Sequence, residues 1–174
     1  MAAYGTYTTG PGGALRKSRS LSGNPHYVTG NFSYDIQGLK DLHGEEITDI
    51  AFAQIRRYLR RPGERMRGSE PGDFFKICIQ DHVIRKAVER DPHIGLFPLT
   101  TYVIIHELIH VVRFAKFVQR FDSTPAEQEI EERRVHELTF SLLQKARVSG
   151  LPEVLAAFRD CRMMENFLAP SGTT

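Results

Sequence analysis

This chain of 174 residues lacks the features that mark several protein classes. It has only two cysteines, Cys78 and Cys161, which are too few and too far apart for a disulfide scaffold or a cysteine-ligated zinc site. Residues 1–20 contain no apolar stretch that could serve as a signal peptide, and no run approaches the roughly 20 apolar residues that a membrane span needs. The formal net charge of only +2 gives no strong bulk attraction to nucleic acid or membranes. We therefore expect a cytoplasmic protein that is not attached to a membrane.

The distribution of residue types divides the chain into three parts. Residues 1–30 are rich in Gly, Ser and Thr and can bury little apolar surface, so we expect a flexible tail there. Residues 31–168 form the expected single domain, because the chain as a whole is 41% hydrophobic and 25% charged, as globular proteins are. Residues 169–174 form a short frayed tail.

Hydrophobic periodicity predicts a domain that is mainly α, with a possible minor β-sheet that would make it α+β. Alternating apolar residues in 31–42 predict a short strand. The segment 74–89 fits either a strand followed by a helix or a single helix, and its helical stripe slightly favours the single helix. Apolar residues at helical spacing predict the remaining helices, at about 45–60, 102–120, 125–146 and 152–167.

The start of the third of these helices is the best-defined boundary in the sequence. Thr124 can cap the helix, Pro125 suits its first position, and Glu127 completes a capping box. We expect this helix to stop near Gly150.

The most informative segment is Val103–Val112, which contains the pattern His-Glu-x-x-His. Two histidines four residues apart on a helix, His106 and His110, project from one face and are close enough to bind one metal ion. Glu107 lies between them, beside the metal position and outside its coordination shell. The other residues of the segment are all aliphatic, which suits a buried metal helix because a loose charge there would be costly to desolvate.

All ten positions of this segment fit the extended signature of the zincin metallopeptidases, which the chain therefore resembles. The resemblance implies a zinc-dependent hydrolase, most simply a peptidase acting on peptides or proteins. It also implies that His106 and His110 bind the zinc and that Glu107 accepts a proton from a zinc-activated water molecule. Tyr102 and His136 are candidates for a donor that stabilises the substrate oxygen.

The third ligand must come from outside the motif. No glycine and third histidine follow His110 at the spacing of H-E-x-x-H-x-x-G-x-x-H, so the resemblance is to the gluzincin branch, in which a glutamate on a later helix ligates zinc. Helical bearings place Val135, Leu138 and Leu142 on the buried stripe of the helix from Pro125. Two glutamates lie near that stripe, and we prefer Glu132, with Glu131 and His136 as the alternatives.

Two other functions remain as alternatives. A di-iron helical bundle uses two E-x-x-H motifs, of which this chain has one, at Glu107 and His110. A non-catalytic module that binds metal or nucleic acid is the other, and it would use a local basic cluster. We do not expect nucleic-acid binding, because no nucleic-acid motif accompanies this cluster, which comprises Arg56, Arg57, Arg60, Arg61, Arg65 and Arg67.

Overall fold

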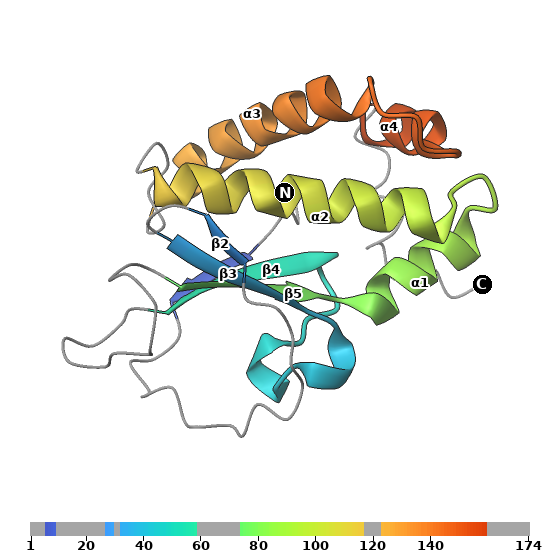
Figure 1. Ribbon diagram of the computed structural model, residues 1–174. Helices are drawn as coiled ribbons and strands as arrows, with labels where there is room; N and C mark the ends of the chain where they lie inside the picture. Colours follow the sequence, from blue (N-terminus) through green and yellow to red (C-terminus); the bar gives the residue numbers. More distant parts are fainter. Residues whose placement is uncertain (1–5, 10–26, 30–31, 59–73, 117–122, 160–174) are drawn as a thin grey trace.

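The computed structural model describes residues 6–9, 27–29, 32–58, 74–116 and 123–159 (Figure 1). The strands within these residues are β1 (Thr6–Thr9), β2 (Tyr27–Thr29), β3 (Phe32–Gln37), β4 (Ala53–Tyr58) and β5 (Phe74–Ile79). The α-helices are α1 (Asp81–Arg90), α2 (Leu96–Ala115), α3 (Pro125–Leu143) and α4 (Leu151–Arg159). Two 3-10 helices, η1 (Leu39–Asp41) and η2 (Gly44–Glu46), follow β3.

All described strands belong to one sheet in the order β1-β4-β5-β3-β2. β4 and β5 are antiparallel at its centre, and β1 and β3 join them in parallel on either side. The expected combination of helices with a sheet is thus present, and more described residues lie in helices than in strands. Two segments of the expected flexible tail, β1 and β2, are the edge strands of this sheet. The expected tail at 169–174 lies outside the described residues.

The predicted helix at 45–60 is wrong, because this segment contains η2, a loop and the strand β4. Two of the isoleucines that suggested a helical stripe, Ile47 and Ile50, are exposed. In β4 the apolar Ala53 and Ile55 alternate with polar residues, but both faces of the strand are buried. The apolar residues of 45–60 recur at helical spacing as well, which is why this segment was predicted as a helix.

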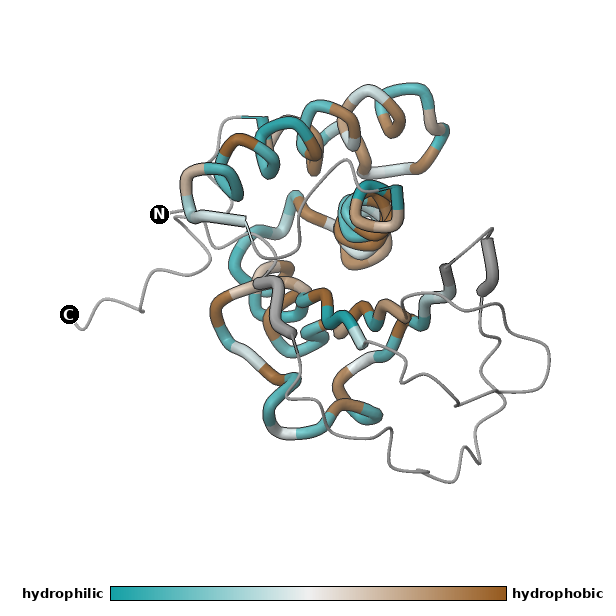
Figure 2. Tube along the Cα trace, turned by 90° about the vertical axis from the view of Figure 1, so that its left-hand side faces the viewer, coloured by the Kyte–Doolittle hydropathy of each residue, from teal (hydrophilic) through white to brown (hydrophobic). Residues whose placement is uncertain are grey.

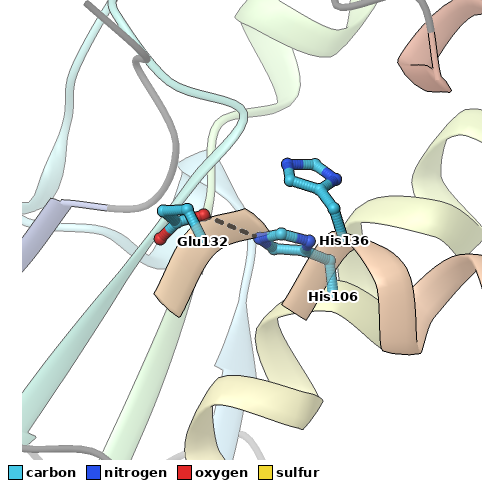
Figure 3. A group of neighbouring side chains, drawn as sticks. All are labelled: His106, Glu132 and His136. Atoms are coloured by element: carbon cyan, nitrogen blue, oxygen red, sulfur yellow. Dashed lines mark ion pairs between the residues drawn. The ribbon is translucent and has the colours of Figure 1, made fainter. Parts of the chain in front are cut away.

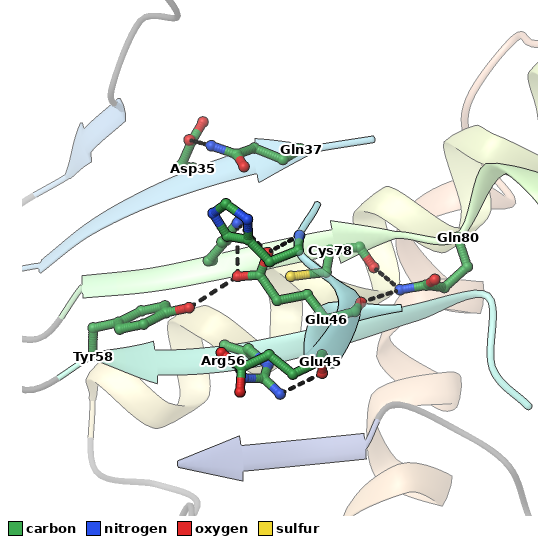
Figure 4. Close-up of polar contacts among 10 residues, drawn as sticks. Asp35, Gln37, Glu45, Glu46, Arg56, Tyr58, Cys78 and Gln80 are labelled. Carbon is green, nitrogen blue, oxygen red and sulfur yellow. Dashed lines mark hydrogen bonds and ion pairs between the residues drawn. The ribbon is translucent and has the colours of Figure 1, made fainter. Parts of the chain in front are cut away.

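The segment 74–89 is a strand followed by a helix, so the preference for a single helix is also wrong. Phe75 and Ile77 of β5 belong to the hydrophobic core, and the ring of Phe75 stacks on Phe114 of α2 with centroids 6.1 Å apart. Cys78 points to the opposite face (Figure 4), and so does Lys76, which contacts Glu46 of η2; both are buried. Cys78 is a buried free thiol.

α2 is the central element, lying between the sheet and α3 (Figures 1 and 2). It begins at Leu96, earlier than expected, and buries apolar side chains such as Val103 and Val111 in the core. By length and composition it is the one described helix that could cross a membrane, so the expectation that no run approaches that length is wrong for it. A helix packed on two sides has the same apolar composition, so this property alone assigns no membrane location.

α3 begins where the capping signal predicted. The hydroxyl of Thr124 accepts a hydrogen bond from the backbone N–H of Glu127, and the Glu127 carboxylate accepts one from the backbone N–H of Thr124. The helix ends at Leu143, before the expected stop near Gly150, and α4 follows from Leu151.

The buried stripe of α3 differs from the predicted one. Leu138 and Leu142 are 39% and 59% exposed. The buried residues of α3 are instead Glu131, Glu132, Val135, Thr139 and Leu143. Glu132 therefore lies on the stripe that packs against α2, where a charge is costly unless it is paired or ligating.

The face of the sheet away from α2 is covered by the η1–η2 segment and carries a buried polar network (Figure 4). The Lys76 ammonium donates to both carboxylate oxygens of Glu46, at 2.7 Å each, and the Tyr58 hydroxyl donates to one of them at 3.0 Å. The Gln80 amide donates to the Glu46 carbonyl at 2.8 Å. This network fastens the segment between β3 and β4 to the sheet.

The same network changes the interpretation of the basic cluster. Arg56 is buried on β4, and its guanidinium donates to the carbonyl of Glu45 at 2.6 Å. It is therefore unavailable to an external partner, and Arg57 is only half-buried. The other four arginines of the cluster lie outside the described residues.

Candidate metal centre

The motif histidines lie on the buried face of α2. His106, Glu107 and His110 are 4%, 3% and 0% exposed. The Nε2 atoms of the two histidines are 3.2 Å apart, so the four-residue spacing does bring two potential donor atoms together.

Glu132 of α3 completes a compact group with these histidines. One of its carboxylate oxygens lies 3.3 Å from His106 Nε2, and the other lies 3.2 Å from His110 Nε2. Figure 3 shows the contact with His106. The glutamate preferred on the sequence is thus the one that the structure places against both histidines.

The donor atoms have a spacing that suits zinc. Bonds of about 2.0–2.1 Å at tetrahedral angles separate the ligand atoms by about 3.3–3.4 Å. The two Nε2 atoms are 3.2 Å apart, and each lies 3.2–3.3 Å from a different carboxylate oxygen of Glu132. Two imidazole nitrogens and one carboxylate are also a donor set found in catalytic zinc sites, which keep the fourth position for water or substrate.

The electrostatics of the group favour neutral histidines beside a charged carboxylate. Burial lowers the pKa of His106, against the opposing effect of the nearby Glu132 carboxylate. Burial alone would raise the pKa of Glu132, but hydrogen bonds from His106 and His110 outweigh it and hold that pKa far below its ordinary value. Metal ligation needs these protonation states, since only deprotonated imidazole and carboxylate groups coordinate.

Glu107, between the two motif histidines in the chain, is buried and has a different environment from Glu132. Burial raises its pKa to about 7; the His110 charge opposes this rise and the Glu132 charge adds to it. One of its carboxylate oxygens, Oε2, is buried with no hydrogen-bond partner among the described residues. A carboxylate with a pKa near neutrality is well suited to accept and return a proton.

Glu131, the first alternative ligand, has another role in the structure. Its carboxylate forms an ion pair with Arg113 of α2, and Arg134 lies 3.8 Å from its second oxygen. These contacts explain why a second carboxylate is buried on α3, and they leave Glu131 outside the histidine group. Arg113 was not expected near the site, although its position three residues after His110 puts it on the same side of α2.

His136, the second alternative, lies beside His106. Their ring centroids are 4.4 Å apart, and His136 is half-buried whereas the other members of the group are buried. Its Nδ1 is 2.5 Å from the hydroxyl of Tyr102. Burial, together with the charge of His106, lowers the pKa of His136 to about 3.

Two overlapping ligand sets are therefore present. One ligand atom each from His106, Glu132 and His136 lie within 4.8 Å of one another, so this trio could also hold an ion. In the trio with His110 in place of His136, the two Nε2 atoms are 3.2 Å apart and each lies within 3.3 Å of one carboxylate oxygen of Glu132. The trio with His110 contains both motif histidines, whereas the trio with His136 contains only one of them.

His82 of α1 has a different partner. Its ring pairs with Asp49 at 3.1 Å, on the loop before β4. Phe158 of α4 was not predicted to be near the site, and it stacks on Tyr102 with centroids 3.9 Å apart.

Comparison with protein-family models, with curated proteins and with solved structures found no match for this chain. The resemblance to the zincins therefore depends on the residues of α2 and α3 alone.

Proposed function

We propose that this chain is a zinc-dependent metallohydrolase of zincin-like fold and gluzincin type, acting as a peptidase on peptide or protein substrates in the cytoplasm. The observation that supports it is the placement of Glu132 against both motif histidines. Its carboxylate oxygens lie 3.3 and 3.2 Å from His106 Nε2 and His110 Nε2, respectively.

In this proposal His106, His110 and Glu132 hold the metal. When bound, zinc supplies Lewis acidity: it polarises a carbonyl group and lowers the pKa of a coordinated water. The burial of all three side chains keeps bulk water away from the ligands and so strengthens their interaction with a cation.

Glu107 is the general base. It lies next to His106 in the chain, and its Oε2 atom has no hydrogen-bond partner among the described residues. This oxygen is therefore available to take a proton from the attacking water. After the carbonyl has been attacked, Glu107 returns the proton to the leaving amine.

The test is the variant Glu107→Gln, which keeps the size of the side chain and removes its basicity. Hydrolysis of a library of quenched fluorescent peptides should fall by about 100- to 10,000-fold, the usual contribution of a general base. Zinc content should remain one ion per chain, because Glu107 is not a ligand. Glu129→Gln, at an exposed position of α3, is the matched control and should retain full activity.

A Glu107→Gln protein that binds zinc and hydrolyses peptides as fast as the wild type would contradict the assigned role. Metal stoichiometry separates the proposal from the di-iron alternative, because one zinc per chain supports it and two irons support the bundle.

A further inference from the structure

The outer side of α3 carries three large apolar side chains that are exposed. Ile130, Leu138 and Leu142 are 60%, 39% and 59% exposed, respectively. With the exposed Arg134 they follow one another at steps of four residues, so their side chains form one row along the helix. α3 lies on the side of α2 away from the sheet (Figure 1). Apolar side chains gathered in one row, unlike exposed residues scattered singly, indicate a contact surface.

Charged residues continue this row with opposite signs at its two ends. Glu127, whose carboxylate also caps α3, lies three residues before the row, and Lys145 lies three residues after it. Near the middle, Arg134 and Glu137 add one charge of each sign, and all four side chains are exposed. A row that is acidic at one end and basic at the other is complementary to an identical row that runs in the opposite direction.

The positions of these residues fit an antiparallel pair of α3 helices related by a two-fold axis. The midpoint of the row lies six residues from both Ile130 and Leu142, so an axis at this point places Ile130 of one copy opposite Leu142 of the other. Glu127 and Lys145 are both nine residues from the same point and are therefore also opposite each other. Each contact occurs twice in such a dimer, because a two-fold axis exchanges the two residues between the copies.

We propose that α3 binds the α3 helix of a second copy of this chain in this antiparallel arrangement, through the row from Ile130 to Leu142. An anionic membrane fits the row less well, because its negative surface would repel the exposed Glu127 and Glu137. One helix pair is a small interface, so the dissociation constant should be of the order of micromolar or weaker and the dilute chain should be a monomer.

The interface and the metal centre occupy different sides of α3. Glu132 belongs to the buried stripe that packs against α2, whereas the residues of the row are exposed. Association of two copies therefore leaves the metal ligands in place. The inference does not depend on the proposed hydrolytic function, and the two can fail separately.

Sedimentation velocity of the full chain over a wide range of concentrations tests the inference. The wild type should change from the sedimentation coefficient of a monomer to that of a dimer as its concentration rises. Ile130→Glu should weaken association by at least about 100-fold, because each dimer would bury two unpaired carboxylates. Ile50→Glu is the matched control, since Ile50 is 57% exposed on the segment before β4, and this variant should associate as the wild type does.

Exchange of charges tests the direction of the helices. In the antiparallel pair, Arg134 of one copy lies beside Glu137 of the other. Arg134→Glu and Glu137→Arg each bring like charges together in their own dimers, so each variant should associate about 5- to 30-fold more weakly than the wild type. An equimolar mixture of the two variants should form a heterodimer about as stable as the wild-type dimer, because opposite charges then meet. The double variant should recover in the same way.

A wild-type chain that remains monomeric up to its solubility limit would overturn the inference. Equal association of the wild type and Ile130→Glu would show that two copies meet elsewhere, and it would overturn the inference as well. The antiparallel arrangement is wrong if the mixed variants associate no better than each variant alone. Binding of the monomer to phosphatidylserine vesicles without self-association would assign the row to a membrane instead. Circular dichroism spectra establish that each variant is folded.

Discussion

Glu131 and Glu132 are adjacent, buried and acidic, yet the structure gives them different partners, so the same substitution at each should have different consequences. Glu132→Gln removes a carboxylate that lies 3.2 and 3.3 Å from the two histidine nitrogens. Glu131→Gln removes a carboxylate that pairs with Arg113. Glutamine preserves the size of both side chains, so each variant is the matched control of the other.

The expected magnitudes follow from these contacts. Loss of a group that only orients a zinc ligand weakens zinc binding by about 10- to 100-fold, so loss of a ligand itself should weaken it by at least about 100-fold, or about 2.8 kcal/mol. Glu131→Gln leaves a partly buried guanidinium without its ion-pair partner, and it should lower the free energy of unfolding by about 1–3 kcal/mol. Its zinc affinity should match that of the wild type.

Zinc-dependent thermal stability is a direct assay. At a free zinc concentration about 100 times the wild-type Kd, zinc should stabilise the wild type and Glu131→Gln by about 2.7 kcal/mol. A 100-fold weaker site in Glu132→Gln would gain only about 0.4 kcal/mol. Chelator competition at 25 °C gives the affinities independently. Equal zinc stabilisation of Glu132→Gln and the wild type would refute the ligand assignment, and so would an equal loss of zinc affinity in both variants.

Two further predictions concern the fold. Glu46→Gln should cost about 3–5 kcal/mol at pH 7, because it leaves the buried Lys76 ammonium without its carboxylate. The pKa of Glu46 is held below its ordinary value of 4.5 by the backbone of His43 and by Lys76, so its contribution is fully present above that pH and is lost as the pH falls through the lowered pKa. Urea unfolding should therefore give a difference between wild type and variant that shrinks below about pH 4; a difference that does not change with pH would count against the network. Leu143→Ala should cost about 2–5 kcal/mol and Leu142→Ala less than about 0.5 kcal/mol, because these neighbours are 6% and 59% exposed. Similar losses in the two variants would show that the buried stripe of α3 is misplaced.

The sequence predicted those parts of the fold whose signals are local. The capping box of Thr124 and Glu127 located the start of α3, because both residues act within one helical turn. The alternation at the start of the domain predicted β3. β4 was missed because the apolar residues of 45–60 also recur at helical spacing. For β5 the strand was one of two interpretations, and the single helix was preferred because the apolar stripe of 74–89 continues into α1.

The residues of the candidate site could likewise be predicted from the sequence where the signal is local. The spacing of His106 and His110 and the position of Glu132 on its helix are local properties, and these three residues meet in the structure. What decides between Glu132 and Glu131 is Arg113, which lies 18 residues before Glu131 in the chain. Helical bearings alone do not show such a partner on another helix.

The central claim is that two imidazoles of α2 and one carboxylate of α3 bind a single zinc ion. Native mass spectrometry of the purified full chain, before and after addition of zinc, tests this claim most directly. We predict one zinc per chain in the wild type and none in His106→Ala. A wild-type protein that is free of metal and takes up no added zinc would contradict the account.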